Sequence, residues 1–307
     1  MAADLILRTY GDVSRKEDVV LNAVEILTAK EDQITNLIGR TKAIDTVHSY
    51  LTDTLATAGS IAVDEAAVFT PSARTTPARL TNLVQNMVMD YQVTNTQRAV
   101  EHYHGQDELQ RQTSKALKEW GNGLEFDLVR STLVSGVSGT TPKMKGIIAA
   151  ISKSTNYTSH TSGTVFSASI LDGLMKGNWE NSNGDVATDL FVGSFLRNVI
   201  DTFTQKTNQL VTDATATRIL RSVTLYENSF GVVSIHKHRY VQASSDATGR
   251  VLAINPEKFA LAWLEMPYID TGLARTSDAT PRRIIGKGTL EVHNQDSNWF
   301  ADGFDKD

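Results

Sequence analysis

The longest regular pattern of apolar and polar residues in the chain runs from Gly105 to Gly136. Apolar residues recur there at three- and four-residue steps, and Gln, Lys, Arg and Glu fill the other positions. This period predicts an amphipathic helix with one buried stripe, formed by Leu109, Ala116, Leu117, Trp120, Leu124, Leu128 and Val129. Unbroken, about thirty residues would span about 45 Å. We expect Gly121 and Gly123 to bend or break this helix. On periodicity alone, such a helix most often simply covers a core.

A different pattern precedes the helix, between Ser60 and Gln97. From Met87 to Val93 apolar and polar residues largely alternate, which predicts a half-buried strand. The segment before it is rich in Thr, Ala, Arg and Pro, with a turn-like tip at Pro71–Pro77. Two strand-like runs joined by such a tip predict a long, projecting β-hairpin. An exposed hairpin leaves unpaired backbone that invites pairing with another chain.

The other apolar segments are short and predict helices and strands in mixed order. Helices are predicted at 169–179 and 194–206, and strands at 190–193, on either side of a turn at 228–231, within 250–266 and at 283–294. Two polar segments, 135–146 and 152–168, are predicted to be loops. This mixture is typical of an α+β fold and not of an alternating βαβ series.

The N-terminal region, residues 1–58, has a helical pattern but little to form a core of its own. Its apolar positions at helical spacing are Val19, Val20, Val24, Leu27, Ile34, Leu37 and Ile38. Without further information, we interpret it as surface helices on a larger domain.

Composition narrows the class of protein. The chain has 307 residues, of which 40% are hydrophobic and 21% charged, enough for a sizeable core. Its net charge is -5, and no run of Lys or Arg is long enough for a nucleic-acid-binding arm. The absence of cysteine excludes disulfides, thiol nucleophiles and cysteine metal sites. No signal peptide and no apolar run of membrane-spanning length is visible, so we expect no membrane partner.

Candidate chemistry is sparse. His236 and His238 flank Lys237 with a spacing that can bind metal, and His102 and His104 repeat it, but neither pair has a carboxylate or third histidine nearby in sequence. No nucleophile elbow, phosphate-binding loop or zinc-protease helix motif occurs. We therefore expect no metal, no cofactor and no enzymatic activity. An enzyme whose site is assembled from scattered residues remains an alternative.

Several segments, in order, resemble the SU10-like family of phage major capsid proteins, which has the Hong Kong 97-type shell fold. GQDELQRQ followed by ALKEWGNGLEFDLVRSTLVSG is similar to the family's spine helix, and Glu108, Gln112 and Glu125 approximately match its polar positions. NLIGRTKAIDTVHSYLTDTLATAG resembles the opening segment, and VTNTQRAV the entry to the spine helix. The C-terminal segment resembles the closing strand, but departs from it at Lys287 and at Asp296–Asn298.

The resemblance implies an α+β, Hong Kong 97-like fold in four parts. These are an N-terminal arm (1–58), an extended loop (59–100), a peripheral domain with the spine helix (101–139 and 282–307) and an axial domain (140–281). It also implies subunit-contact candidates, namely Arg74 and Arg79 at the hairpin and Glu108, Gln112 and Glu125 on the helix. Solvated tip arginines are an equally good interpretation of the first two.

The function implied is structural. Hexamers and pentamers of the chain would form an icosahedral shell around double-stranded DNA, assembled in the host cytoplasm and ending in the virion. A scaffold, portal or decoration protein could be a further partner. A nanocompartment shell of the same fold, which encloses a cargo enzyme instead of DNA, remains an alternative.

Overall fold

The computed structural model describes residues 33–56, 58–66, 68, 74–99, 108–136, 139–151, 156–182, 184–203, 224–242, 248–275 and 277–305. Its helices are α2 (Gln33–Leu37), α3 (Asn95–Ala99), α4 (Glu108–Arg130), α5 (Ile147–Ile151), α6 (Ala168–Asn181), α7 (Ser194–Phe203) and the 3-10 turn η3 (Pro256–Lys258). Its strands are β1 (Gly39–Lys42), β2 (Val47–Thr52), β3 (Ala78–Leu83), β4 (Gln85–Thr94), β5 (Tyr157–Thr164), β6 (Asp189–Val192), β7 (Leu225–Asn228), β8 (Gly231–Lys237), β9 (Gly249–Ile254), β10 (Phe259–Asp270), β11 (Ala279–Val292) and β12 (Trp299–Phe304). The mixed order confirms the predicted α+β class.

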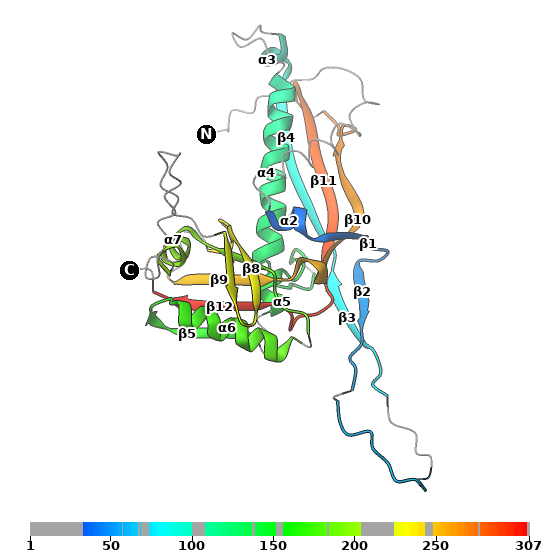
Figure 1. The fold of residues 1–307 in the computed structure, drawn as a ribbon. Helices are drawn as coiled ribbons and strands as arrows, with labels where there is room; N and C mark the ends of the chain where they lie inside the picture. The colour runs from blue at the N-terminus through cyan, green and yellow to red at the C-terminus, as the bar shows by residue number, and fades with distance from the viewer. Residues whose placement is uncertain are drawn as a thin grey trace, which may run out of the picture.

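One half of the molecule is a four-stranded sheet in the order β1-β10-β11-β4 with α4 lying along it (Figure 1). We call this unit the helix-backed sheet. Alternation along β11 puts Ile284, Leu290 and Val292 on one buried face, as predicted. Trp120 of α4 stacks on Trp263 of β10 with ring centroids 6.2 Å apart. The helix and the sheet therefore share one apolar core.

The long helix is confirmed, but the predicted break at Gly121 and Gly123 is wrong. α4 runs through both glycines as one helix of 23 residues, which corresponds to about 35 Å. Each glycine costs a helix interior about 1 kcal/mol. Burial of an apolar stripe from Leu109 to Val129 against the sheet offsets that cost.

The other half is a six-stranded sheet in the order β5-β12-β9-β6-β8-β7, with α6 and α7 beside it (Figure 1). It has a second apolar core that includes Phe166, Leu190 and Phe304. The loop predicted at 152–168 is wrong for Tyr157–Thr164, which forms β5 and pairs with β12 in parallel. β5 is an edge strand rich in Ser and Thr, so it lacks the apolar alternation that identifies a strand in sequence. Tyr157 anchors it by stacking on Phe300, with centroids 5.8 Å apart.

Two strands join a different sheet from the one their position in the chain suggested. β10 lies within the residues assigned to the axial domain, yet it pairs with β11 in the helix-backed sheet. β12 lies in the C-terminal segment assigned to the peripheral domain, yet it pairs with β5 and β9. Strand pairing joins residues distant in sequence, so a division into continuous segments could not anticipate it.

A hairpin leaves the opposite end of the helix-backed sheet from α3 (Figure 1). Its antiparallel strands β2 and β3 pair from Val47↔Leu83 to Thr52↔Ala78, and the described residues between Thr52 and Ala78 project beyond them (Figure 1). The hairpin thus begins before residue 59, while the predicted strand at Met87–Val93 is confirmed as β4 of the sheet.

Near the N-terminus, Ile34 and Leu37 lie in α2, whereas Val19 to Leu27 fall outside the described residues. Within the described part of the chain, no helix is long and apolar enough to cross a membrane.

Candidate functional site

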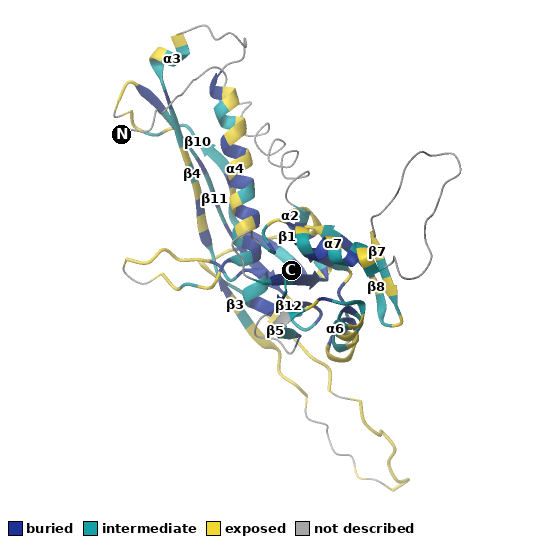
Figure 2. Cartoon of the chain, turned by 90° about the vertical axis from the view of Figure 1, so that its left-hand side faces the viewer, coloured by how far each residue is buried: buried dark blue, intermediate teal, exposed yellow. Residues whose placement is uncertain are grey.

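The projecting hairpin exposes large aliphatic side chains. Leu55 is 97% exposed, Ile61 95%, Val68 88% and Val63 81%, and Figure 2 shows the described part of the loop as exposed along its length. Large aliphatic side chains that are this exposed on one projecting loop indicate a site of interaction with another molecule. The sequence analysis identified the hairpin but missed these residues. The sequence signal that could have identified them is the presence of single aliphatic residues in a loop segment that has no apolar periodicity.

The root of the hairpin is fixed to the rest of the chain by polar contacts. Asn82 of β3 accepts a hydrogen bond from the Lys145 backbone N–H at 2.8 Å and donates to the Leu290 carbonyl at 2.8 Å. The Glu291 carboxylate lies between two imidazoles, those of His48 on β2 and His293, with His293 at 3.2 Å. The apolar loop therefore extends from an anchored base.

The two hairpin arginines differ in their surroundings. Arg74 is exposed, in the loop that precedes β3. Arg79 is also exposed, and its Nη2 donates to Ser49 Oγ at 2.7 Å across the β2–β3 pair. Both side chains lie on the hairpin surface, and their role in subunit contacts stays a prediction.

Glu125, in contrast, lies inside the chain. It has no exposed surface, and its carboxylate receives the backbone N–H groups of Ile34 and Thr35, each at 3.0 Å, and the Thr35 hydroxyl. His238 Nε2 donates to the same carboxylate at 2.8 Å. A buried carboxylate is tolerated when it is fully hydrogen-bonded. Glu125 thus binds α2 to α4, and we correct its interpretation from a subunit contact to an internal anchor.

His238 completes this anchor from the six-stranded sheet. Its Nδ1 accepts hydrogen bonds from the backbone N–H groups of Tyr240 and Val241, at 3.2 and 3.3 Å. Because Nδ1 is an acceptor, the proton lies on Nε2, which donates it to Glu125. One carboxylate therefore links the N-terminal segment, the long helix and the six-stranded sheet. We call Glu125, His238 and Thr35 the arm anchor.

Glu108 and Gln112 lie together in the first turns of α4. Glu108 is buried and accepts hydrogen bonds from Arg111 and from Gln112 Nε2, the latter at 2.7 Å. Gln112 is partly buried. A carboxylate in the first turn of a helix also suits the positive end of its dipole. These contacts stabilise the start of α4, and a subunit contact at either residue stays a prediction.

His236 and His238, whose spacing in the sequence can bind metal, face different partners. His236 Nε2 bonds Asp189 at 2.9 Å, whereas His238 bonds Glu125. Burial acts to raise the pKa of Asp189, but the hydrogen bonds from His236 and Thr188 outweigh it, so the pKa is lowered. His102 and His104 lie outside the described residues. Among those described, no three His, Cys, Asp or Glu side chains are grouped to hold a metal ion.

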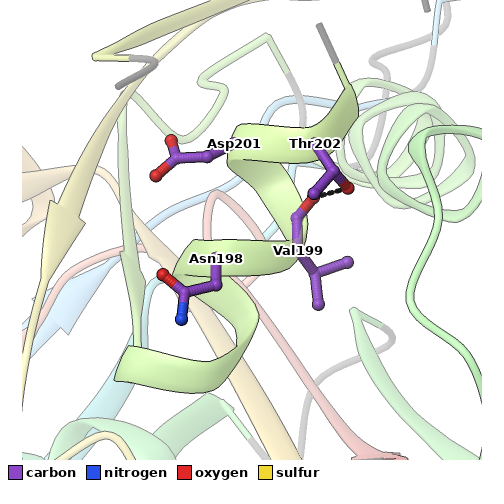
Figure 3. Close-up of a pocket in the computed structure, with 4 residues that line it drawn as sticks. All are labelled: Asn198, Val199, Asp201 and Thr202. Carbon is purple, nitrogen blue, oxygen red and sulfur yellow. Dashed lines mark hydrogen bonds between the residues drawn. The ribbon is translucent and has the colours of Figure 1, made fainter. Parts of the chain in front are cut away.

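A hollow lies beside α7, with a volume of about 420 Å³ (Figure 3). The described residues that line it are Asn198, Val199, Asp201 and Thr202. Thr202 Oγ1 donates to the Val199 carbonyl at 2.6 Å, and Asp201 lies 3.7 Å from the Arg197 guanidinium. Thr202 and Asp201 thus have partners within α7, and the described lining residues have no geometry that indicates catalysis.

Comparison with known proteins gives one consistent result. The sequence matches the family described as SU10 major capsid protein over residues 9–303. No curated protein sequence matches it significantly. A chain of Mycobacterium phage Bobi superposes with a TM-score of 0.60 at 8% identity, covering 98% of this chain and 96% of that one.

Two further similar structures are shells. One is from the satellite phage P4 procapsid including size determination (Sid) protein, with a TM-score of 0.54, 10% identity and coverage of 94% and 99%. The other is the holo-SrpI encapsulin complex from Synechococcus elongatus PCC 7942, with a TM-score of 0.56, 9% identity and coverage of 97% and 92%. At these identities the likeness shows the fold, and it confirms the predicted Hong Kong 97-like architecture.

Proposed function

The chain belongs to the SU10 major capsid protein family, and we propose that its hexamers and pentamers form the icosahedral head of a tailed phage with a double-stranded DNA genome. The structural observation that carries this proposal is the exposed aliphatic loop of the hairpin on an anchored base. Such a loop gains burial only against another molecule. In a shell built from one chain, that molecule is a neighbouring subunit.

The architecture of the subunit is suited to assembly into a shell. Subunits in a closed shell meet through heterologous contacts, where different surfaces of one chain touch. The projecting hairpin supplies reach, and α4 against its sheet supplies a stiff span of about 35 Å. Many such interfaces, each modest, add up to a stable particle. We propose that the chain works by assembly and not by catalysis, a view supported by its family membership.

For the parts of the subunit, we propose that the N-terminal arm reaches residue 46 and that the extended loop covers 47–83. The peripheral domain would then comprise the helix-backed sheet, and the axial domain the six-stranded sheet. For partners, we propose packaged DNA held without sequence recognition, consistent with the net charge of -5. A separate scaffold, portal or decoration protein stays a prediction.

A nanocompartment shell is the second candidate, because the encapsulin structure is about as similar in fold as the phage structures. The family match favours the phage head. The contents of native particles separate the two functions, since nucleic acid indicates a phage head and a co-purifying protein cargo indicates a nanocompartment.

The proposal is tested by electron microscopy and light scattering of the purified chain. Wild-type protein should form capsomer rings or closed particles. Replacing Leu55, Ile61 and Val63 together by Ser should leave folded subunits that no longer form them. Val165→Ser is the matched control, because this side chain is 64% exposed outside the hairpin. Normal particles from the triple variant would remove the loop from the mechanism.

A further inference from the structure

Several arginines lie at the end of the helix-backed sheet that is away from the hairpin, and three of them act on one another as like charges. They are Arg98 in α3, Arg275 in the loop after β10, and Arg282 in β11. The Asn95 backbone N–H donates to the Asp278 carbonyl at 3.0 Å, which brings α3 to the start of β11. In Figure 1 these elements meet beside the first turns of α4.

Arg282 lies on the inner face of the sheet. It pairs in register with Tyr91 of β4, and alternation puts it on the same face as the buried Ile284. The Tyr91 hydroxyl lies 3.0 Å from Thr113 Oγ1 of α4, so this face is turned toward the helix. Only 9% of Arg282 is exposed, and its Nη1 is buried without a hydrogen-bond partner among the described residues.

A second buried donor faces the same way. Thr280 precedes Arg282 by two residues on the same face of β11, and its Oγ1 is also buried with no partner in the part of the chain that the structure describes. Leaving a buried polar group unpaired is costly, and leaving a buried charge unpaired costs more. Two such groups on neighbouring positions indicate that a group not among the described residues pairs with them.

The surrounding charges indicate that this partner is an anion. Burial foremost lowers the pKa of Arg282; Tyr91 opposes this, whereas Arg275 and Arg98 lower it further as like charges, and Asp270 opposes it weakly. Among the described groups that act on Arg282, two are further guanidinium groups and one is a carboxylate. The next residue shows the contrast, because Arg283 points to the other face and makes a two-contact ion pair with Asp90, at 2.5 and 2.8 Å.

We propose that Arg282 and Thr280, with Arg98 and Arg275 beside them, form a binding site for an oxyanion. A guanidinium fork matches a ligand with two acceptor oxygens, either a carboxylate or a phosphate group. The ligand has two possible sources. One is an acidic side chain of a second copy of this chain, which rests on the proposed function, and the other is free phosphate.

The test uses dispersed full-length subunits, with inorganic phosphate titrated against chloride at constant ionic strength. Millimolar phosphate should raise the wild-type melting temperature by about 2–4 °C, because a ligand that binds only the folded state stabilises it. Arg282→Met should melt no lower than wild type in chloride, since it removes an unpaired buried charge, and it should not respond to phosphate. Arg283→Met, on the opposite face, should respond as wild type does.

An equal phosphate response in wild type and Arg282→Met would overturn the proposal. So would a wild-type chain that responds neither as subunits nor as particles. The sources are separated by repeating the titration on assembled particles. If only the subunits respond, a neighbour's carboxylate fills the site in the shell, and if both respond, the ligand is free phosphate. A chain that does not assemble would refute the proposed function and still allow the subunit titration.

Discussion

Replacing Glu125 by Gln tests whether the arm anchor fixes the N-terminal segment to the long helix. In the wild type, Oε1 accepts from Ile34 N and His238 Nε2, and Oε2 accepts from Thr35 N and its hydroxyl. A glutamine side chain keeps one of these oxygens. With its amide nitrogen at the Oε2 position, the side chain can donate to the Thr35 hydroxyl, which turns to accept, but it faces the Thr35 backbone N–H, a donor that it cannot bond.

The expected loss of stability follows from the number of hydrogen bonds that the substitution removes. Hydrogen bonds to a charged group contribute about 1.5–3 kcal/mol each. The loss of this backbone hydrogen bond at a site with no solvent access therefore predicts a loss of about 1.5–3 kcal/mol in the free energy of unfolding. Thr35→Val removes only the hydroxyl donor and predicts a smaller loss, of about 1–2 kcal/mol.

The measurement is urea unfolding of dispersed subunits, followed by tryptophan fluorescence. Amide hydrogen exchange at Ile34 and Thr35 gives a local readout, and it should become faster in Glu125→Gln. Glu119→Gln is the matched control on the same helix, since this carboxylate is half-exposed and 3.8 Å from Lys115. It should change stability by less than about 1 kcal/mol. A loss below about 1 kcal/mol in Glu125→Gln, with unchanged exchange, would refute the anchor.

Three other predictions concern stability. Trp120→Ala should cost about 3–5 kcal/mol in urea unfolding, because the indole is 3% exposed; an unchanged midpoint would contradict its place in the core. Gly303→Ala should cost about 2 kcal/mol or more, since φ is +89° and the new Cβ would lie 2.0 Å from the His160 carbonyl oxygen. Its control is Gly123→Ala, where the helix has room and should gain about 1 kcal/mol. Asp189→Asn should lower the melting temperature at neutral pH. The lowered pKa of Asp189 means that its stabilisation is present above about pH 4 and is lost as the pH falls through the folded-state pKa. The two melting curves should therefore converge in acid, and a constant difference would exclude this linkage.

Local sequence patterns predicted the helices and strands whose buried side chains recur at a regular spacing along the chain. The stripe of α4 and the alternation in β4 and β11 were readable because each buries one face at the period of its backbone. β5 was not readable, because its hydrogen bonds come from β12 far along the chain and its side chains are mostly polar. Gly121 and Gly123 were misread for the same reason, since packing outside the segment decides whether the helix continues.

Some features of the candidate sites could likewise be predicted from the sequence, and others could not. The projecting hairpin was predicted from its turn-forming residues, but not its exposed aliphatic side chains. Glu125 was singled out from a resemblance as a candidate subunit contact, whereas its hydrogen-bond partners lie within the chain, about ninety residues earlier and more than a hundred residues later. Arg282 and Thr280 were not identified at all, because an unpaired donor is defined by what surrounds it.

The sequence by itself determined the α+β class, the long helix, the hairpin and the family, because these depend on residue order and short-range periodicity. Only the tertiary structure decided which strands share a sheet, which carboxylate is internal and which guanidinium lacks a partner. Those outcomes depend on distances between residues far apart in the chain, and on the free energy of removing charge from water.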